Sequence, residues 1–228
     1  PKEEINKIPF FEGLFFGKPS KVKRIPIEKY TITETGLSYF PFQSELAKTY
    51  TGDYKITTQT FWLGTDKFGR DLLSRMLYGI RISLSVGFIA VFISLIIGIT
   101  LGLIAGYFRG RTDDVVMWFV NVIWSIPTLL MVIAITLALG KGFWQVFVAV
   151  GLTMWVEVAR IVRGQVLYIR ELEYVEAGKA LAYKPFRIIF KHILPNVIGP
   201  VIVISAANFA AAILIEAGLS FLGIGAQP

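Results

Sequence analysis

Long runs of apolar residues, separated by short polar stretches, fill the chain after residue 80. An α-helix rises about 1.5 Å per residue, so about 20 apolar residues are needed to cross roughly 30 Å of membrane hydrocarbon. Four segments meet this requirement, namely 82–108, 115–139, 143–162 and 197–215. The pattern predicts an all-α membrane protein with four membrane-spanning helices in this chain.

The polar connections between these segments predict their orientation. Lys and Arg number two in 109–114, one in 140–142 and seven between residues 160 and 191. Because short loops rich in Lys and Arg stay in the cytoplasm, 109–114 and 163–196 are predicted to be cytoplasmic. The turn 140–142 and the residues before 80 are then external. The 13 basic residues up to Arg81 weigh little, since nine acids accompany them and long segments cross largely regardless of charge.

The sequence predicts two parts, an external segment over 1–75 and a membrane core over 76–228. Prolines at positions 9, 19, 26 and 41 interrupt any long helix in the first part. The stretches 21–27 and 54–60 alternate enough to predict short strands. We therefore expect a small, irregular external domain, whose aromatic cluster is Phe10, Phe11, Phe15 and Phe16.

Composition supports a membrane chain and excludes several kinds of site. Charged residues make up 17%, against roughly 25% in soluble domains. The absence of cysteine excludes disulfides and thiolate metal sites, and the single histidine, His192, leaves no pair for zinc. No glycine-rich Gly-Lys-Ser/Thr loop is present to hold phosphates. We expect no cofactor, no metal and no enzymatic site in this chain.

The net charge of +7 is compatible with two classes of anionic partner, nucleic acid and membrane lipid. The basic residues form no stripe among aromatic residues, which argues against nucleic acid. They gather instead beside apolar spans, which favours contact with membrane lipid headgroups.

The cytoplasmic segment 163–196 has the most informative pattern. Residues 171–182 are good helix formers, and Pro185 suits the first turn of a second helix, where its missing N–H costs nothing. The pattern predicts a short helix, a turn and another helix. From composition alone, an amphipathic hairpin that only anchors in lipid headgroups remains an alternative.

The segment contains Glu176 and Ala177 in its first helix and Leu194 and Pro195 at its end. At these four positions it resembles the EAA loop of binding-protein-dependent ABC importer permeases. The sequence departs from that motif at Gly178, where a second alanine is usual, and at Ala182, where glycine is usual. Because glycine adopts positive φ readily and alanine resists it, we expect the turn at Ala182 to differ in geometry. The positions assigned to this ATPase-coupling loop are Glu176, Ala177, Gly178, Ala182, Leu194 and Pro195.

Two further motifs, 63–84 and 216–225, are similar to the permeases of dipeptide, oligopeptide and nickel importers (DppC/OppC-like). The resemblance covers 61–228 with the motifs in the same order. It implies the type I ABC importer permease (MetI-like) fold, with one further span before residue 1 and one after residue 228.

The resemblance also implies function and partners. Such a permease pairs with a second permease subunit, and two ABC ATPase subunits hold the ATP. An extracytoplasmic solute-binding protein delivers a peptide or similar solute. Glu176 is expected to meet an Arg or Lys of the ATPase. The external segment either contacts the binding protein or serves as a spacer.

Polar groups within the predicted spans are candidates for the transport pathway. We expect Pro127 to kink the second span. The candidates for pathway lining are Asn121, Ser125, Thr128 and Asn208. Such side chains more often only hydrogen-bond between helices. Glu157 and Arg160 lie three residues apart on one helix face, where they can pair with each other. Charges within a span are candidates for function, but the position of these two near the cytoplasmic end of the span favours snorkelling to the membrane surface.

Two other patterns predict packing. Gly98, Gly102 and Gly106 recur every four residues, which permits the close approach of another helix, in this chain or in a partner. Asp66 and Asp71, with Arg70 and Arg75, predict a salt-bridged collar before the first core span.

Two alternative functions stay open. A membrane-embedded enzyme would draw on acids such as Glu157 and Glu216, but nothing gathers them with a base or a nucleophile. A secondary transporter or channel is not driven by ATP, and a repeat-built one would show hydropathy symmetry between its halves, which this chain lacks. Dependence of transport on an ATPase partner distinguishes these hypotheses.

Overall fold

The computed structural model describes residues 25, 27–33, 36–41, 44, 46–58, 60–140 and 142–225. The chain divides into two compact units, Pro1–Arg81 and Ile82–Pro228. The predicted aromatic cluster at residues 10–16 and the prolines at 9, 19 and 26 lie outside the described residues.

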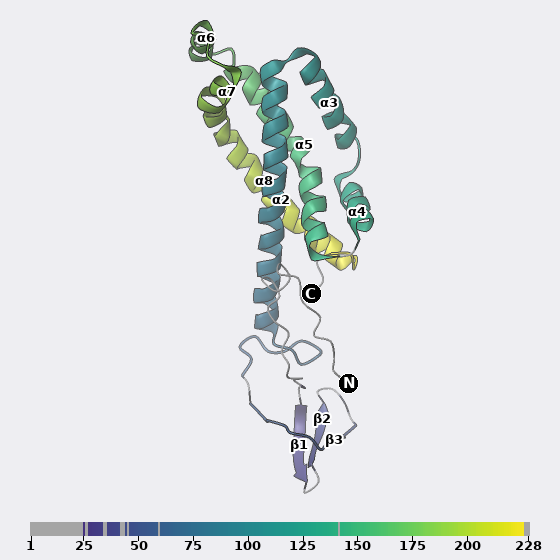
Figure 1. The fold of residues 1–228 in the computed structure, drawn as a ribbon. Coiled ribbons are helices and arrows are strands. Elements are labelled where there is room, and N and C mark those ends of the chain that lie inside the picture. Colours follow the sequence, from purple (N-terminus) through teal and green to yellow (C-terminus); the bar gives the residue numbers. More distant parts are fainter. Residues whose placement is uncertain are drawn as a thin grey trace. The chain divides into compact units, whose positions relative to one another are not determined.

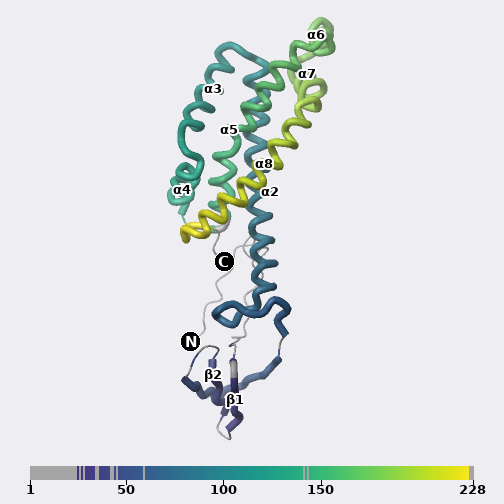
Figure 2. The backbone as a smooth tube through the Cα atoms, turned by 180° about the vertical axis from the view of Figure 1, so that it is seen from behind, coloured from purple at the N-terminus to yellow at the C-terminus, as the bar shows by residue number. Residues whose placement is uncertain are grey.

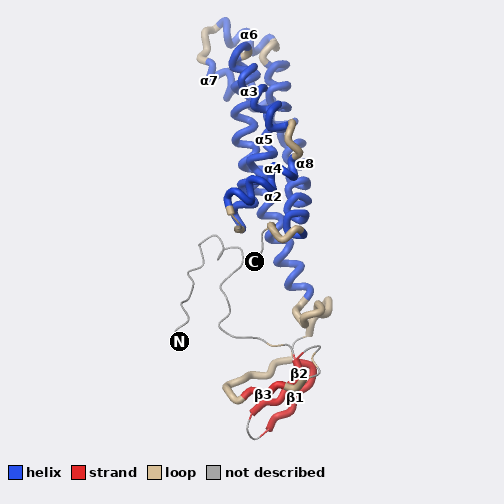
Figure 3. The backbone as a smooth tube through the Cα atoms, turned by 90° about the vertical axis from the view of Figure 1, so that its right-hand side faces the viewer, coloured by secondary structure: helices blue, strands red, loops and turns tan. Residues whose placement is uncertain are grey.

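The first unit contains a small antiparallel sheet, in the order β1 (Ile27–Thr33), β2 (Gly36–Pro41) and β3 (Lys48–Tyr50) (Figure 3). The strand predicted over 54–60 was wrong, because its described residues are irregular. Most of the strand predicted over 21–27 lies outside the described residues, and β1 begins only at Ile27. Among the described residues of the sheet only Leu37 is buried, so the strands show little alternation for a sequence pattern to detect.

The charged residues predicted to form one collar form two separate sets of bonds, one around Asp66 and one around Asp71. Asp66 accepts hydrogen bonds from the backbone N–H groups of Phe68 and Arg70, and forms ion pairs with Arg70 at 2.9 Å and Arg75 at 3.0 Å. Desolvation opposes ionisation of Asp66, but these hydrogen bonds and the Arg70 charge hold its pKa below the ordinary value. Asp71 instead accepts the N–H groups of residues 73 and 74, which caps the first turn of the following helix.

Long apolar helices form the second unit. Three segments of the described residues, Leu72–Phe108, Trp144–Ile169 and Pro185–Phe221, are long and apolar enough to cross a membrane. A fourth span requires the bent pair Gly110–Trp124 and Thr128–Leu139 to count as one. The helices are α2 (Leu72–Phe108), α3 (Gly110–Trp124), α4 (Thr128–Leu139), α5 (Phe143–Ile169) and α8 (Leu194–Phe221) (Figure 1).

The second predicted span is broken rather than gently kinked. α3 and α4 meet at 90° across residues 125–127. Pro127 lies immediately before α4, where its missing N–H leaves no gap in that helix. The position of the predicted kink is therefore confirmed, but the 90° angle between α3 and α4 is larger than a kink within one continuous helix would give.

The predicted polar loop over 109–114 was wrong, because α3 already begins at Gly110. Only Arg109 separates α2 from α3, and both Arg109 and Gly110 have a φ of 56°. Two consecutive residues with positive φ reverse the chain in minimal length, so the charges of this stretch lie on a helix.

The three glycines predicted to permit close helix packing contact α5 of the same chain. A Cβ atom built on Gly98 would lie 2.5 Å from the Val158 side chain, and one on Gly102 would lie 2.7 Å from the Ala159 carbonyl oxygen. Gly106 meets Val166 in the same way. The four-residue glycine spacing thus lets α2 and α5 approach almost backbone to backbone.

Candidate functional site

The helix–turn–helix predicted in the cytoplasmic segment is present at one end of the helical unit (Figures 2 and 3). α6 spans Glu173–Ala180, α7 spans Pro185–Ile188, and the π-helical turn η1 spans Ile189–Ile193 before α8 begins. Pro185 occupies the first turn of α7, as predicted. We call residues 170–193 the coupling hairpin, after the role that the sequence resemblance implies for this segment.

Charge placement favours the local fold of α6. Glu173 and Glu176 lie in its first turn and Lys179 in its last, which complements the helix dipole at both ends. Lys179 Nζ also donates to the Arg170 carbonyl oxygen at 3.2 Å, which links the end of α6 to the end of α5.

The turn after α6 keeps the geometry that glycine normally provides. The N–H of Ala182 donates to the Lys179 carbonyl at 2.9 Å, and that of Tyr183 donates to the Gly178 carbonyl at 3.1 Å. This pair of bonds is a Schellman motif, with Ala182 at the position that requires positive φ. Its φ is 57°. The expectation that alanine would change the turn was therefore wrong, because the two hydrogen bonds hold the alanine in the left-handed conformation.

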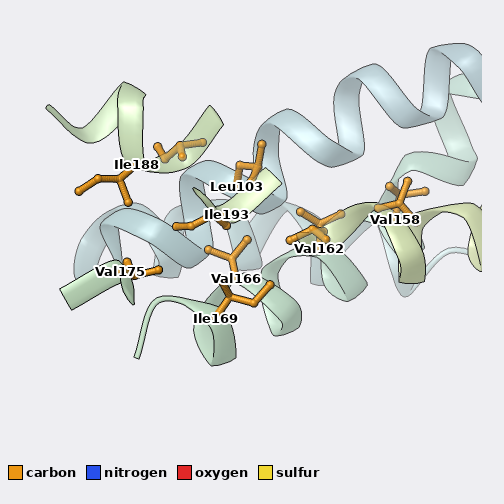
Figure 4. Packing of buried hydrophobic residues seen from close by; sticks show 11 residues of the cluster. Leu103, Val158, Val162, Val166, Ile169, Val175, Ile188 and Ile193 are labelled. Atoms are coloured by element: carbon orange, nitrogen blue, oxygen red, sulfur yellow. The ribbon is translucent and has the colours of Figure 1, made fainter. Parts of the chain in front are cut away.

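The coupling hairpin has one buried face and one exposed face. Val175, Ile188 and Ile193 point inward and pack with Val166 and Leu103 of the membrane helices (Figure 4). This contact makes the hairpin continuous with the transmembrane core. The outer face presents the exposed apolar side chains of Tyr174, Leu181, Phe186 and Phe190.

The six assigned coupling positions divide between these faces. Glu176 and Ala177 are exposed, whereas Gly178 is buried against Tyr183 and Ile188. Ala182 forms the turn. The remaining two, Leu194 and Pro195, begin α8 and connect the hairpin to that span.

Ion pairs that sequence reasoning missed bind the hairpin end of α5 to its neighbours. Arg163 donates two hydrogen bonds of 2.5 Å to the Asp113 carboxylate of α3. Arg109 pairs with Glu171 at 2.6 Å, and Arg170 donates to the Tyr107 carbonyl oxygen. These bonds place the two basic segments predicted to be cytoplasmic at the same end of the helical unit. The only signal in the sequence was the clustering of opposite charges beside the apolar spans.

The four pathway-lining candidates separate into two pairs. The side-chain oxygen of Asn121 accepts a 2.6 Å hydrogen bond from Arg160, and the backbone carbonyl oxygen of Asn121 accepts one from the Ser125 hydroxyl. Thr128 and Asn208 instead line a cavity of about 190 Å³. The first pair bonds α3 to α5 and closes the last turn of α3, while the second lines a partly open cavity.

The two charges predicted to pair within α5 do not do so among the described residues. Arg160 bonds to Asn121 and lies 3.7 Å from the ring centre of Trp124, whereas Glu157 lines the cavity. Glu216, the first residue after the predicted span 197–215, is only 6% exposed and accepts hydrogen bonds from Ser83 and Ser220. α8 continues past it to Phe221.

Several known proteins are similar to this chain in sequence or in architecture. Residues 98–228 match the family described as the inner membrane component of binding-protein-dependent transport systems. The dipeptide transport system permease protein DppC of Bacillus subtilis is 48% identical over 166 residues, which are 73% of this chain and 52% of the relative. The oligopeptide permease OppC of the same organism is 42% identical over 75% of this chain and 56% of the relative.

A third relative is the glutathione transport system permease protein GsiD of Pectobacterium atrosepticum, 37% identical over 73% of this chain and 56% of its own length. The chain thus spans about half the length of the curated relatives it matches. A solved structure of the MetNI methionine ABC transporter, in an inward-facing conformation, aligns with a TM-score of 0.62 at 20% identity. That alignment covers 68% of this chain and 77% of the other, and it supports the MetI-like fold.

Proposed function

Since this chain belongs to the family of inner membrane components of binding-protein-dependent transport systems, we propose that it is a permease subunit of an ATP-driven ABC importer. Together with a second permease subunit it encloses a membrane pathway for di- or oligopeptides or related small solutes. Two ABC ATPase subunits supply the energy, and an extracytoplasmic binding protein delivers the solute.

The coupling hairpin is the observation that carries this proposal. Large apolar side chains exposed at a helix end indicate a surface that another protein covers, because water solvates them poorly. Leu181 is 66% exposed and Phe186 is 74% exposed, beside the exposed carboxylate of Glu176. An apolar patch on the same hairpin as the exposed carboxylates of Glu173 and Glu176 fits a groove on the ATPase that offers an Arg or Lys to Glu176.

The packing behind this surface can transmit movement of the ATPase. Val175 of α6 and Ile188 of α7 belong to one buried cluster with Val162 and Val166 of α5, and with Leu103 of α2 (Figure 4). Close-packed interiors deform little, so a displacement of the hairpin moves the helices as a rigid group. ATP-driven closure of two ATPase subunits would thereby switch the spans between inward-open and outward-open states.

The substrate class is inferred from the relatives. The three relatives described above are named for transport of dipeptides, oligopeptides and glutathione, which share peptide bonds and a free amino group. We infer a small peptide or peptide-like solute for this chain, with the binding protein contributing most of the selectivity.

Co-purification of the ATPase tests the proposal. The permease is expressed with its partner permease and ATPase subunits, with residues 170–191 intact or replaced by a Gly/Ser linker. The matched control replaces residues 54–58, in the first unit, by the same linker. We expect the ATPase to be lost only when 170–191 are replaced. If the ATPase binds neither the intact nor the replaced form, although the protein is inserted, a secondary transporter becomes the better hypothesis.

A point substitution avoids the disruption of the hairpin core. Glu176→Lys reverses an exposed charge and leaves the buried cluster intact, so the protein should insert normally and lose ATP-dependent uptake. The control Glu173→Lys reverses the other acidic residue of the same turn, and we expect a smaller loss. Normal uptake by Glu176→Lys would refute the assigned role of Glu176.

A further inference from the structure

A cavity of about 190 Å³ lies among the helices of the second unit, where α3 and α4 meet at 90° and face α5 and α8. We call it the α5 cavity. Most of its lining is apolar, and Trp124, Met131 and Met154 form part of the wall. Four polar side chains also line it, namely Thr128, Thr153, Glu157 and Asn208. A mostly apolar pocket with a few convergent polar groups is the usual form of a small-molecule site.

Glu157 gives the α5 cavity its charge. It lies on α5, and its side chain is exposed rather than buried, so a ligand in the cavity can reach it. A charged residue within an apolar span is a candidate for function. None of the ion pairs among the described residues includes Glu157, and Arg160, one turn away, is bonded to Asn121. The cavity therefore presents an unneutralised negative charge.

Asn208 on α8 adds an unsatisfied donor. Its side chain is only 2% exposed, and its Nδ2 has no hydrogen-bond partner among the described residues. Buried polar groups are normally paired, so a buried orphan beside a cavity indicates a missing partner. Thr153, also buried, donates its hydroxyl to the Val150 carbonyl at 2.8 Å, which leaves the Thr153 oxygen free to accept.

We propose that the α5 cavity binds the amino-terminal residue of a peptide substrate, with Glu157 paired to its primary ammonium group. Asn208 Nδ2 donates to the carbonyl oxygen of that residue, and Thr153 accepts from the adjacent N–H groups. The inference rests on the proposed transport function and adds the position and chemistry of a substrate site.

The size of the cavity limits what it holds. Pockets that enclose an entire drug-sized ligand have volumes of roughly 300–1,000 Å³. At about 190 Å³ the α5 cavity accommodates one amino-acid residue rather than a whole oligopeptide. The remainder of the substrate then lies outside the cavity, which allows peptides of different lengths to share the same terminal site.

Fluorescence of Trp124 provides a direct test, because that indole lines the cavity. The complete transporter, in nanodiscs without ATP or binding protein, is titrated with Ala-Ala and with N-acetyl-Ala-Ala. We expect a saturable change with Ala-Ala only, absent in Trp124→Phe. Loss of a hydrogen-bonded charge pair predicts about 10- to 100-fold weaker binding of Ala-Ala to Glu157→Gln. Glu157→Asp should retain part of the affinity. The control Asp53→Asn changes an exposed carboxylate of the first unit and should bind normally.

Several results would overturn the inference. Equal binding of the acetylated and free peptides, equal binding by Glu157→Gln and wild type, or no saturable change in wild type would each do so. Loss of the second permease subunit from Glu157→Gln would show that Glu157 pairs with that subunit instead. ATPase co-purification is measured in the same preparations, so failure of this site is distinguished from failure of the transport proposal.

Discussion

Ala182 has a φ of 57°, in the backbone region where glycine is the usual residue. The left-handed conformation costs an L-residue with a Cβ atom about 1–2 kcal/mol. Replacement by glycine removes this cost but adds about 0.4–1 kcal/mol of conformational entropy to the unfolded chain. The difference predicts that Ala182→Gly stabilises the hairpin turn by about 0.5–1 kcal/mol, a two- to fivefold change in its opening equilibrium.

A second Schellman motif, at the end of α8, provides a matched control for the turn at Ala182. There Gly223, with a φ of 74°, donates to the Ser220 carbonyl, and Ile224 donates to the Leu219 carbonyl. Gly223→Ala should therefore destabilise its turn by a similar amount, with the opposite sign to Ala182→Gly.

Hydrogen–deuterium exchange in nanodiscs measures both effects. Exchange of the Ala182-turn amides, at residues 181–183, should slow two- to fivefold in Ala182→Gly. Exchange at residues 222–224 should accelerate in Gly223→Ala. Faster exchange in Ala182→Gly would refute the reasoning, because it would mean that the left-handed alanine is unstrained or that its methyl group stabilises the hairpin.

Three other predictions concern packing and charge. Gly102→Val places its Cβ atom 2.7 Å from the α5 backbone, so thermal unfolding should show the helical unit destabilised by about 1–3 kcal/mol. The control Gly164→Ala has open space around its Cβ atom and should be neutral or stabilising. A double-mutant cycle of Arg163→Ala and Asp113→Ala should give a coupling energy of about 1–2 kcal/mol, and a value near zero would contradict the bidentate pair. The lowered pKa of Asp66 means that its bonds stabilise the collar above pH 3.8 and are lost as pH falls through the folded value. The protection factors of the amides at residues 66–70, which correct for the intrinsic slowing of exchange in acid, should therefore fall in acid in wild type and not in Asp66→Asn.

The sequence predicted the membrane helices because a lipid environment leaves few choices. A chain in hydrocarbon must satisfy its backbone hydrogen bonds internally, so an uncharged run of sufficient length becomes a helix whatever its neighbours are. The break at Pro127 and the start of α7 at Pro185 followed from the missing proline N–H. The glycine spacing in α2 predicted close packing, and its partner, α5, became known only from the structure.

The sheet, the Ala182 turn and the α5 cavity could not be read from the sequence. The sheet buries too little for an alternating pattern. Ala182 is a poor candidate for positive φ by residue type, and the hydrogen bonds of the Schellman motif override that preference. Arg160 and Glu157 seemed suited to pair with each other, yet Arg160 finds Asn121, 39 residues earlier in the chain.

The sequence alone thus determined which segments form the long apolar helices, that Pro127 interrupts the second of them, and which family its motifs resemble. Only the tertiary structure decided which charges pair, which glycines meet which helix, and that Glu157, Thr153 and Asn208 surround one cavity. The physical reason is range: hydropathy and backbone preference act within a few residues, whereas hydrogen bonds and packing depend on side chains that approach only when distant helices assemble.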